Sequence, residues 1–229
     1  IWGYDHVPIP STITYTVPAP RDDSARRLQA EVGDFLVGAG YTEIMGLTLT
    51  AEGIYSQLKA FSPASLVHVL NPLSSDLNVL RPTLLVGALD AVARNTARQR
   101  PNLKLFEFGR VHHLTGAKGS AESPLEPYRE TTNLAITLAG KPHPETWAEP
   151  QRDLTVFDLK GAVENVLGYL GIPLGRLEYS APPEGIYGHG LTIALKGVCL
   201  GHFGEVDAGI SKAFGIKQTV LYAELAWDT

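Results

Sequence analysis

The sequence predicts an α+β fold whose sheet is mostly antiparallel and flanked by helices. Helical stripes of apolar residues are interspersed with paired strands, which does not fit a strict strand–helix alternation. Two strand segments flank a Lys196–Gly197 turn in the manner of a hairpin. The chain has 229 residues, 44% of them hydrophobic and 19% charged, which is enough for a folded protein with a core of its own.

The first 20 residues predict an extended connector, because they hold four prolines and show no helical periodicity. We expect residues 21–229 to form one domain with the connector lying along it. The chain begins with Ile1 and has no basic stretch before an apolar run, so we expect a piece of a longer protein and no signal peptide. No apolar run reaches the roughly 18 residues needed to span a bilayer.

The first half of the domain predicts two longer helices. One is expected over residues 22–40 and the other from Pro82 to Pro101, because proline is tolerated in the first turn of a helix but not beyond it. The buried stripe of the first helix is expected to consist of Ala25, Leu28, Val32, Phe35, Leu36 and Ala39. Between the helices the patterns indicate a strand at 41–50, a short helix at 51–61, a strand at 67–70 and a turn at 71–76.

The second half predicts most of the sheet. Strands are expected at residues 103–112 and 133–139, on both sides of the 196–197 turn, and at 219–225. Helices are expected within 153–170, after a strand-like start, and at 208–214, and a polar loop is expected at 114–129.

Glu107 is a carboxylate within an otherwise apolar strand. By alternation it shares one face with Leu103, Leu105 and Val111. A carboxylate on such a face is costly unless it is paired or hydrogen-bonded. Two interpretations are open: a structural carboxylate held by a partner such as Arg81 or by backbone amides, or a former active-site position.

Several kinds of site find no support. His112 and His113 are adjacent on a strand and point to opposite faces, and no HExxH or paired-cysteine spacing occurs. The sequence has no GxSxG, GxGxxG or Walker pattern, which disfavours a hydrolase nucleophile and a phosphate loop. Cys199 is the single cysteine, and its apolar neighbours predict a buried, inert thiol in a reducing compartment.

The net charge of −5 provides no overall attraction for a polyanion, so any contact with RNA must be local. A modest basic cluster at one helix end consists of Arg94, Arg98, Arg100 and Lys104. Cations at that end favour the helix dipole and solubility. The alternative is a possible contact with RNA phosphates.

Ordered sequence blocks carry a resemblance that covers nearly the whole chain. They are IWGYDHVP at 1–8, NPLSSDLNVLRPTLLVGALDAVARN at 71–95, LKLFEFGRV at 103–111, FDLKG at 157–161, GHFGEV at 201–206 and VLYAEL at 220–225. In this order they resemble the catalytic-like core of the β subunit of bacterial phenylalanyl-tRNA synthetase. The resemblance implies a class II aminoacyl-tRNA synthetase-like core, with residues 1–20 as the tail of a preceding domain.

The same resemblance implies a module without catalysis. Active class II synthetases place an arginine in a Phe-Arg-x-Glu strand to hold the ATP α-phosphate, whereas this strand reads FEFG at 106–109. They also need a glycine-rich strand before a helix that ends in arginine, whereas residues 222–227 read YAELAW. Glu107 is therefore a degenerate active-site position, and we expect no catalytic, cofactor-binding or metal-binding residue in this chain.

As a β-subunit fragment, the chain is expected to assemble with the catalytic α subunit in a heterotetramer. The holoenzyme would use ATP and magnesium and act on tRNA-Phe in the cytoplasm, with no membrane association. A stand-alone class II-like paralogue with a regulatory or biosynthetic role is the alternative, followed by an unrelated hydrolase.

By the resemblance, the helix at 22–40 is the possible subunit interface. Its outer face consists of Arg27, Glu31, Asp34 and Gly38, which are short or charged enough for a second helix to approach. An ordinary amphipathic helix with a solvated outer face is the alternative.

Overall fold

A computed structural model describes residues 3–17, 23–56, 58, 60–117, 119–120 and 123–228. The strands of the main sheet are β1 (Thr42–Glu43), β5 (Leu103–Leu114), β6 (Tyr128–Ala139), β7 (Leu177–Ser180), β8 (Tyr187–Leu195), β9 (Val198–Val206) and β10 (Val220–Ala226). A small second sheet holds β2 (Leu49–Thr50), β3 (Val67–His68) and β4 (Val79–Leu80). The α-helices are α1 (Ser24–Gly38), α2 (Glu52–Tyr55), α3 (Leu85–Ala97), α4 (Val156–Tyr169) and α5 (Ala208–Ala213).

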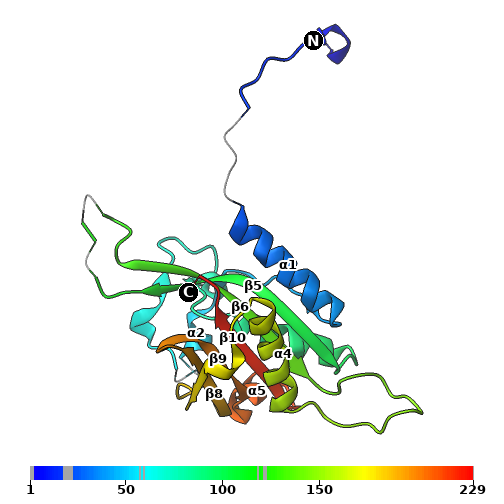
Figure 1. The fold of residues 1–229 in the computed structure, drawn as a ribbon. Coiled ribbons are helices and arrows are strands. Elements are labelled where there is room, and N and C mark those ends of the chain that lie inside the picture. Colours follow the sequence, from blue (N-terminus) through cyan, green and yellow to red (C-terminus); the bar gives the residue numbers. More distant parts are fainter. Residues whose placement is uncertain are drawn as a thin grey trace.

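The main sheet has the strand order β1-β5-β6-β10-β9-β8-β7 (Figure 1). Its neighbouring strands are antiparallel except for β1 and β5, which run parallel. The second sheet, in the order β2-β4-β3, is antiparallel. The predicted α+β fold with a mostly antiparallel sheet and flanking helices is therefore confirmed.

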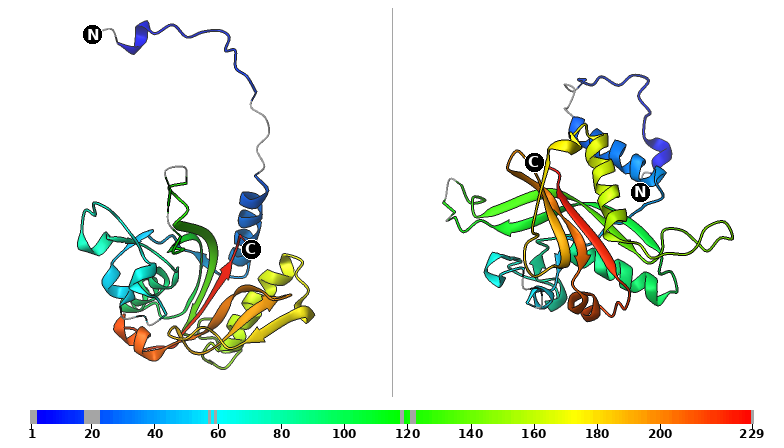
Figure 2. Two further views of the ribbon diagram at one scale, coloured as in Figure 1. Left: turned by 90° about the vertical axis from the view of Figure 1, so that its left-hand side faces the viewer. Right: turned by 60° about the horizontal axis from the view of Figure 1, so that its bottom comes forward.

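Apolar residues pack on both faces of the main sheet, under helices seen in two further views in Figure 2. On one face, α2, α3 and α5 pack over a core that includes Leu105 of β5. On the other face, α1 and α4 pack over a core that includes Phe106 of the same strand. Alternate residues of one strand enter opposite cores, so a single sheet serves both.

Two helices begin where their sequences supply hydrogen-bond acceptors. At α4, the Thr155 hydroxyl and the Asp158 carboxylate form a capping box. Before α3, the Thr83 hydroxyl accepts a hydrogen bond from the Leu85 amide at 3.1 Å. The helix therefore begins three residues after Pro82 and not at the proline itself.

The first helix differs from its predicted burial. Val32 and Leu36 are buried as expected, but Leu28 is 39% exposed, and Ala25 and Ala39 are exposed as well. The N-terminal half of α1 extends beyond the main sheet (Figure 2), so the first part of the predicted stripe has no strand beneath it.

Residues 3–17 are exposed throughout, and Figure 1 shows them leading away from the sheet. The expected position of this segment along the domain is therefore wrong for the described residues. The proposed boundary at residues 20 and 21 lies outside the described part of the chain, and the division into connector and domain stays a prediction.

The single strand expected over residues 41–50 is wrong, because the segment contributes to two sheets. β1 pairs with β5 of the main sheet, whereas β2 pairs with β4 of the small one. The sequence also did not reveal β4 and β7, which have two and four residues. Within the described ranges, no helix is long and apolar enough to cross a membrane.

Candidate functional site

Two carboxylates lie in one row across the main sheet. The register places Glu107 of β5 opposite Ala135 of β6, which in turn is opposite Glu224 of β10. His202 of β9 continues the row beyond Glu224. Adjacent strands lie about 4.8 Å apart, so the two glutamates come from strands roughly 10 Å apart and point to the same face.

Glu107 is buried and paired with Arg81. Its carboxyl Oε1 accepts a hydrogen bond from Arg81 Nη1 at 2.7 Å and another from the Gly46 amide at 3.0 Å. Arg81 is 6% exposed and also donates through Nε to the Arg110 carbonyl at 3.0 Å. The structural partner that the sequence suggested, Arg81, is therefore confirmed. The charge of each residue is neutralised by the other inside the protein.

Glu224 is the centre of a second hydrogen-bond network. Asn133 Nδ2 donates to its Oε1 at 2.7 Å, and the Leu84 amide donates to the same oxygen at 3.3 Å. The hydroxyls of Tyr222 and Thr83 donate to Oε2 at 2.6 and 2.5 Å. Four donors thus hold this partly buried carboxylate in place.

Together the two carboxylates fix the segment that precedes α3. Glu107 of β5 holds Arg81, whereas Glu224 of β10 holds Thr83 and the Leu84 amide. Sequence reasoning missed Glu224, although the available signal was the same as for Glu107: one carboxylate in a strand of apolar residues.

A cavity of about 320 Å³ opens beside Glu224. Phe61, Tyr187 and Tyr222 provide aromatic walls, while His113 and His202 add polar atoms. The cavity lies over strands β6, β10 and β9, which are neighbours in that order. It is on the face of the sheet that also carries Glu107.

Burial shifts the titration of several groups around the cavity. Desolvation lowers the pKa of both His113 and His202, and the nearby Glu224 charge opposes this effect. Desolvation, reinforced by the Glu224 charge, raises the pKa of the Tyr187 and Tyr222 hydroxyls well above the usual value. At neutral pH the two histidines and two tyrosines are therefore uncharged.

The charges of the row that holds Glu107 and Glu224 are unsuited to binding the phosphate groups of ATP. Glu107 and Glu224 carry carboxylates, which repel phosphate. Arg81 already pairs with Glu107 and is not free to bind a phosphate. No lysine or arginine lines the cavity beside Glu224 among the described residues. Within the same ranges, no group of three or more His, Cys, Asp or Glu side chains is arranged to hold a metal ion.

The predicted basic cluster is divided by the main sheet. Arg94 lies on α3, and Arg98 and Arg100 follow this helix; all three are exposed. Lys104 lies on β5 with its ammonium 6.0 Å from the centroid of the Tyr41 ring. By alternation Lys104 points to the face of Phe106, opposite the face covered by α3, so the four cations do not form one patch.

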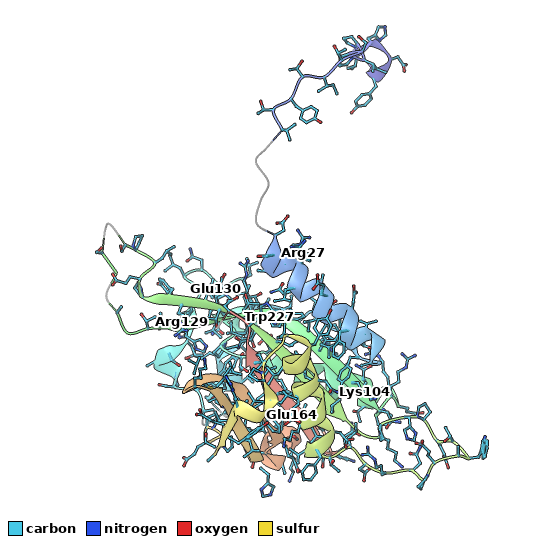
Figure 3. The ribbon with its side chains drawn as sticks, viewed as in Figure 1. Arg27, Lys104, Arg129, Glu130, Glu164 and Trp227 are labelled. Atoms are coloured by element: carbon cyan, nitrogen blue, oxygen red, sulfur yellow. The ribbon has the colours of Figure 1, made fainter. Side chains whose placement is uncertain are left out.

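The outer face of α1 is open to solvent. Arg27, Glu31, Asp34 and Gly38 are all exposed, and Figure 3 shows Arg27 at the end of the helix that extends from the sheet. Among the described residues, the three charged side chains form no ion pair. An exposed face with unpaired charges fits both a solvated surface and a docking surface.

Cys199 contradicts the prediction of a buried thiol, because it is exposed. It lies at the start of β9, directly after the turn at Lys196–Gly197, where the hairpin end lies at the surface. Its Sγ is 3.9 Å from His202 Nε2 on the same strand.

Comparison with known proteins agrees with the fold and with the family resemblance of the sequence. A family model described as the phenylalanyl tRNA synthetase beta chain CLM domain matches residues 9–227. The phenylalanine–tRNA ligase beta subunit of Bacteroides fragilis is 38% identical over 229 residues, covering 99% of this chain. That of Porphyromonas gingivalis is 36% identical and covers 100% of this chain. The chain spans 28% of the length of each of these relatives.

Among solved structures, a pyrrolysyl-tRNA synthetase from Desulfitobacterium hafniense has a TM-score of 0.65 at 15% sequence identity. The match covers 88% of this chain and 65% of that chain. At this identity the likeness concerns the fold, which is that of a class II synthetase core.

Proposed function

Because this chain belongs to the family of phenylalanyl-tRNA synthetase β chains, we propose that it serves phenylalanine–tRNA ligase as a non-catalytic, class II-like scaffold. The relatives reported above are β subunits that match along the whole chain, which favours a module of the ligase over a stand-alone paralogue.

The observation that carries this proposal is the Arg81–Glu107 ion pair. A catalytic class II site needs a free cation on this strand to bind the α-phosphate, and here the strand provides a buried carboxylate. The nearest guanidinium is held by that carboxylate at 2.7 Å and is not free to bind a phosphate. Glu107 thus fits a degenerate active-site position that now has a structural role.

In the proposed assembly the catalytic chemistry, with ATP and magnesium, belongs to the α subunit. This chain would contact that subunit through the exposed face of α1, and the holoenzyme would act on tRNA-Phe in the cytoplasm. The exposed charges of α1, which have no partner in the described part of the chain, support this choice of surface.

The proposed direct contact with RNA lies on the side of the sheet that α3 covers. Arg94, Arg98 and Arg100 are neighbours at the end of α3 and are available to phosphates. Lys104 belongs to the opposite face and would not join the same contact. Each phosphate contact that is removed should make the salt dependence of tRNA binding by the holoenzyme shallower.

Calorimetric titration with ATP–magnesium tests the proposal. The chain alone should give no binding heat, whereas the phenylalanyl-tRNA synthetase α subunit, as the positive control, should bind. The chain should also co-purify with that α subunit. Micromolar ATP binding by the isolated chain, or a failure to associate with the α subunit, would contradict the proposed role.

A further inference from the structure

The cavity beside Glu224 carries one negative charge. Glu224 is the single Asp, Glu, Lys or Arg side chain that lines it among the described residues. Its four hydrogen bonds come from neutral donors, so they fix the carboxylate without neutralising its charge.

The other polar side chains of the cavity are neutral and can both donate and accept hydrogen bonds. Asn133 uses its amide nitrogen to donate to Glu224, which leaves its Oδ1 as an acceptor. His202 pairs through Nδ1 with the Thr192 hydroxyl at 2.9 Å, and its Nε2 lies 3.9 Å from the Cys199 Sγ. His113 forms no hydrogen bond within the described part of the chain, and a neutral imidazole has one donor and one acceptor nitrogen.

The apolar part of the cavity limits the kind of ligand further. Phe61, Ile186 and Tyr187 line it together with the buried Tyr222 ring. Aromatic ring faces attract cations, and an apolar wall favours a ligand with a hydrocarbon body. A volume of about 320 Å³ corresponds to a small molecule and not to a peptide or a nucleotide.

We propose that this cavity binds a small organic ammonium ion. The positive charge of an ammonium group opposes that of the Glu224 carboxylate, and its N–H groups can donate to Asn133 Oδ1 and to the acceptor nitrogen of His113. A carboxylate or phosphate on the ligand would find no lysine or arginine among the described lining residues. This site is separate from the proposed scaffold role, and neither depends on the other.

Three aromatic molecules of similar size test the charge preference: benzylammonium, neutral benzyl alcohol and benzoate. Each is titrated into the 229-residue chain at neutral pH while amide NMR signals are followed. Benzylammonium should shift the signals of Gly201 and Ala226, which line the cavity, and bind at least about tenfold more tightly than benzyl alcohol. Benzoate should not bind. Equal affinities for the cation and the alcohol, or shifts remote from the cavity, would overturn the proposal.

A matched pair of variants tests the place of binding. Ile186→Lys adds a cation to the cavity wall and should abolish benzylammonium binding, whereas Ile186→Gln should keep it within about threefold. Undiminished binding by Ile186→Lys would overturn the site. If either variant does not fold, the three-ligand series on the unaltered chain decides the question by itself.

Discussion

Arg81 and Glu107 form a buried ion pair that joins the segment before α3 to strand β5. Their Nη1 and Oε1 atoms are 2.7 Å apart, and their side chains are 8% and 2% exposed. The same Oε1 accepts the Gly46 amide, which also ties the loop after β1 to this point. The Glu107 carboxylate thus connects three parts of the chain.

Replacing Glu107 by alanine should destabilise the protein strongly. Removal of one partner leaves the other charge buried and unpaired, at a cost of about 3–5 kcal/mol. The double variant Arg81→Met with Glu107→Leu should recover most of this loss, because neither charge is then left behind. Urea unfolding of the three proteins measures the effect.

Glu130 provides the control, since it is half exposed and pairs with Arg110 and His112 at the edge of the core. Glu130→Ala should change the free energy of unfolding by about 0–1 kcal/mol. If Glu107→Ala were as mild as this control, the buried pair would not have the structural role assigned to it.

Tyr222→Phe should destabilise the fold by about 1.5–3 kcal/mol. The Tyr222 hydroxyl is buried and donates to the charged Glu224, and bonds to charged groups contribute this much. Tyr179→Phe removes a similar bond, to Glu164 at 2.8 Å, at an exposed site, so it should cost less than about 1 kcal/mol. Equal costs for the two substitutions in chemical denaturation would refute the central role of the Glu224 network.

The capping box of α4 predicts a pH-dependent stability. Hydrogen bonds from Arg152 and Thr155 hold the pKa of Asp158 far below its usual value, against an opposing desolvation effect. The stabilisation is therefore fully present above the unfolded-state pKa of about 3.9 and is lost as the pH falls through the native pKa. The Arg152 partner is exposed, so its contribution is reduced by solvent screening.

Asp158→Ala should cost about 0.5–2 kcal/mol at neutral pH, the usual range for a lost helix cap. The difference from the unaltered chain should shrink as the pH falls below about 4. Asp153→Ala removes a nearby exposed carboxylate that makes no side-chain hydrogen bond among the described residues, and serves as control. A cost for Asp158→Ala that is constant from neutral to strongly acidic pH would contradict this explanation.

The long helices and strands were predictable because the spacing of apolar residues along the local sequence indicates each type of element. Alternation along residues 103–112 correctly placed Leu105 and Glu107 on one face, and the apolar stripe of α1 correctly identified Val32 and Leu36. An isolated acid in an apolar strand also indicated that Glu107 needs a partner, and Arg81 was a correct suggestion.

The errors concern properties that depend on distant parts of the chain. Leu28 has the right spacing for burial but lies where α1 extends beyond the sheet. Cys199 has apolar neighbours but lies at the end of a hairpin. Strands as short as β4 exist only because partners in two other segments pair with them, which a local pattern does not record.

Charge reversal on the outer face of α1 should weaken association with the α subunit. The double variant Arg27→Glu with Glu31→Arg changes two exposed side chains that form no ion pair among the described residues. The thermal midpoint of the isolated chain should therefore hardly change, since exposed charges contribute about 0–1 kcal/mol to folding. Sedimentation or co-purification with the α subunit measures the association.

Arg176→Glu with Glu178→Arg is the matched control, because these exposed charges lie at the other edge of the sheet, before and within β7. A helix that packs against a partner brings its outer residues within contact distance, so reversed charges there oppose the partner's own. If both double variants assemble like the unaltered chain, Arg27 and Glu31 do not lie at the interface. If both weaken assembly equally, the effect is one of overall charge distribution and the assignment to α1 is lost.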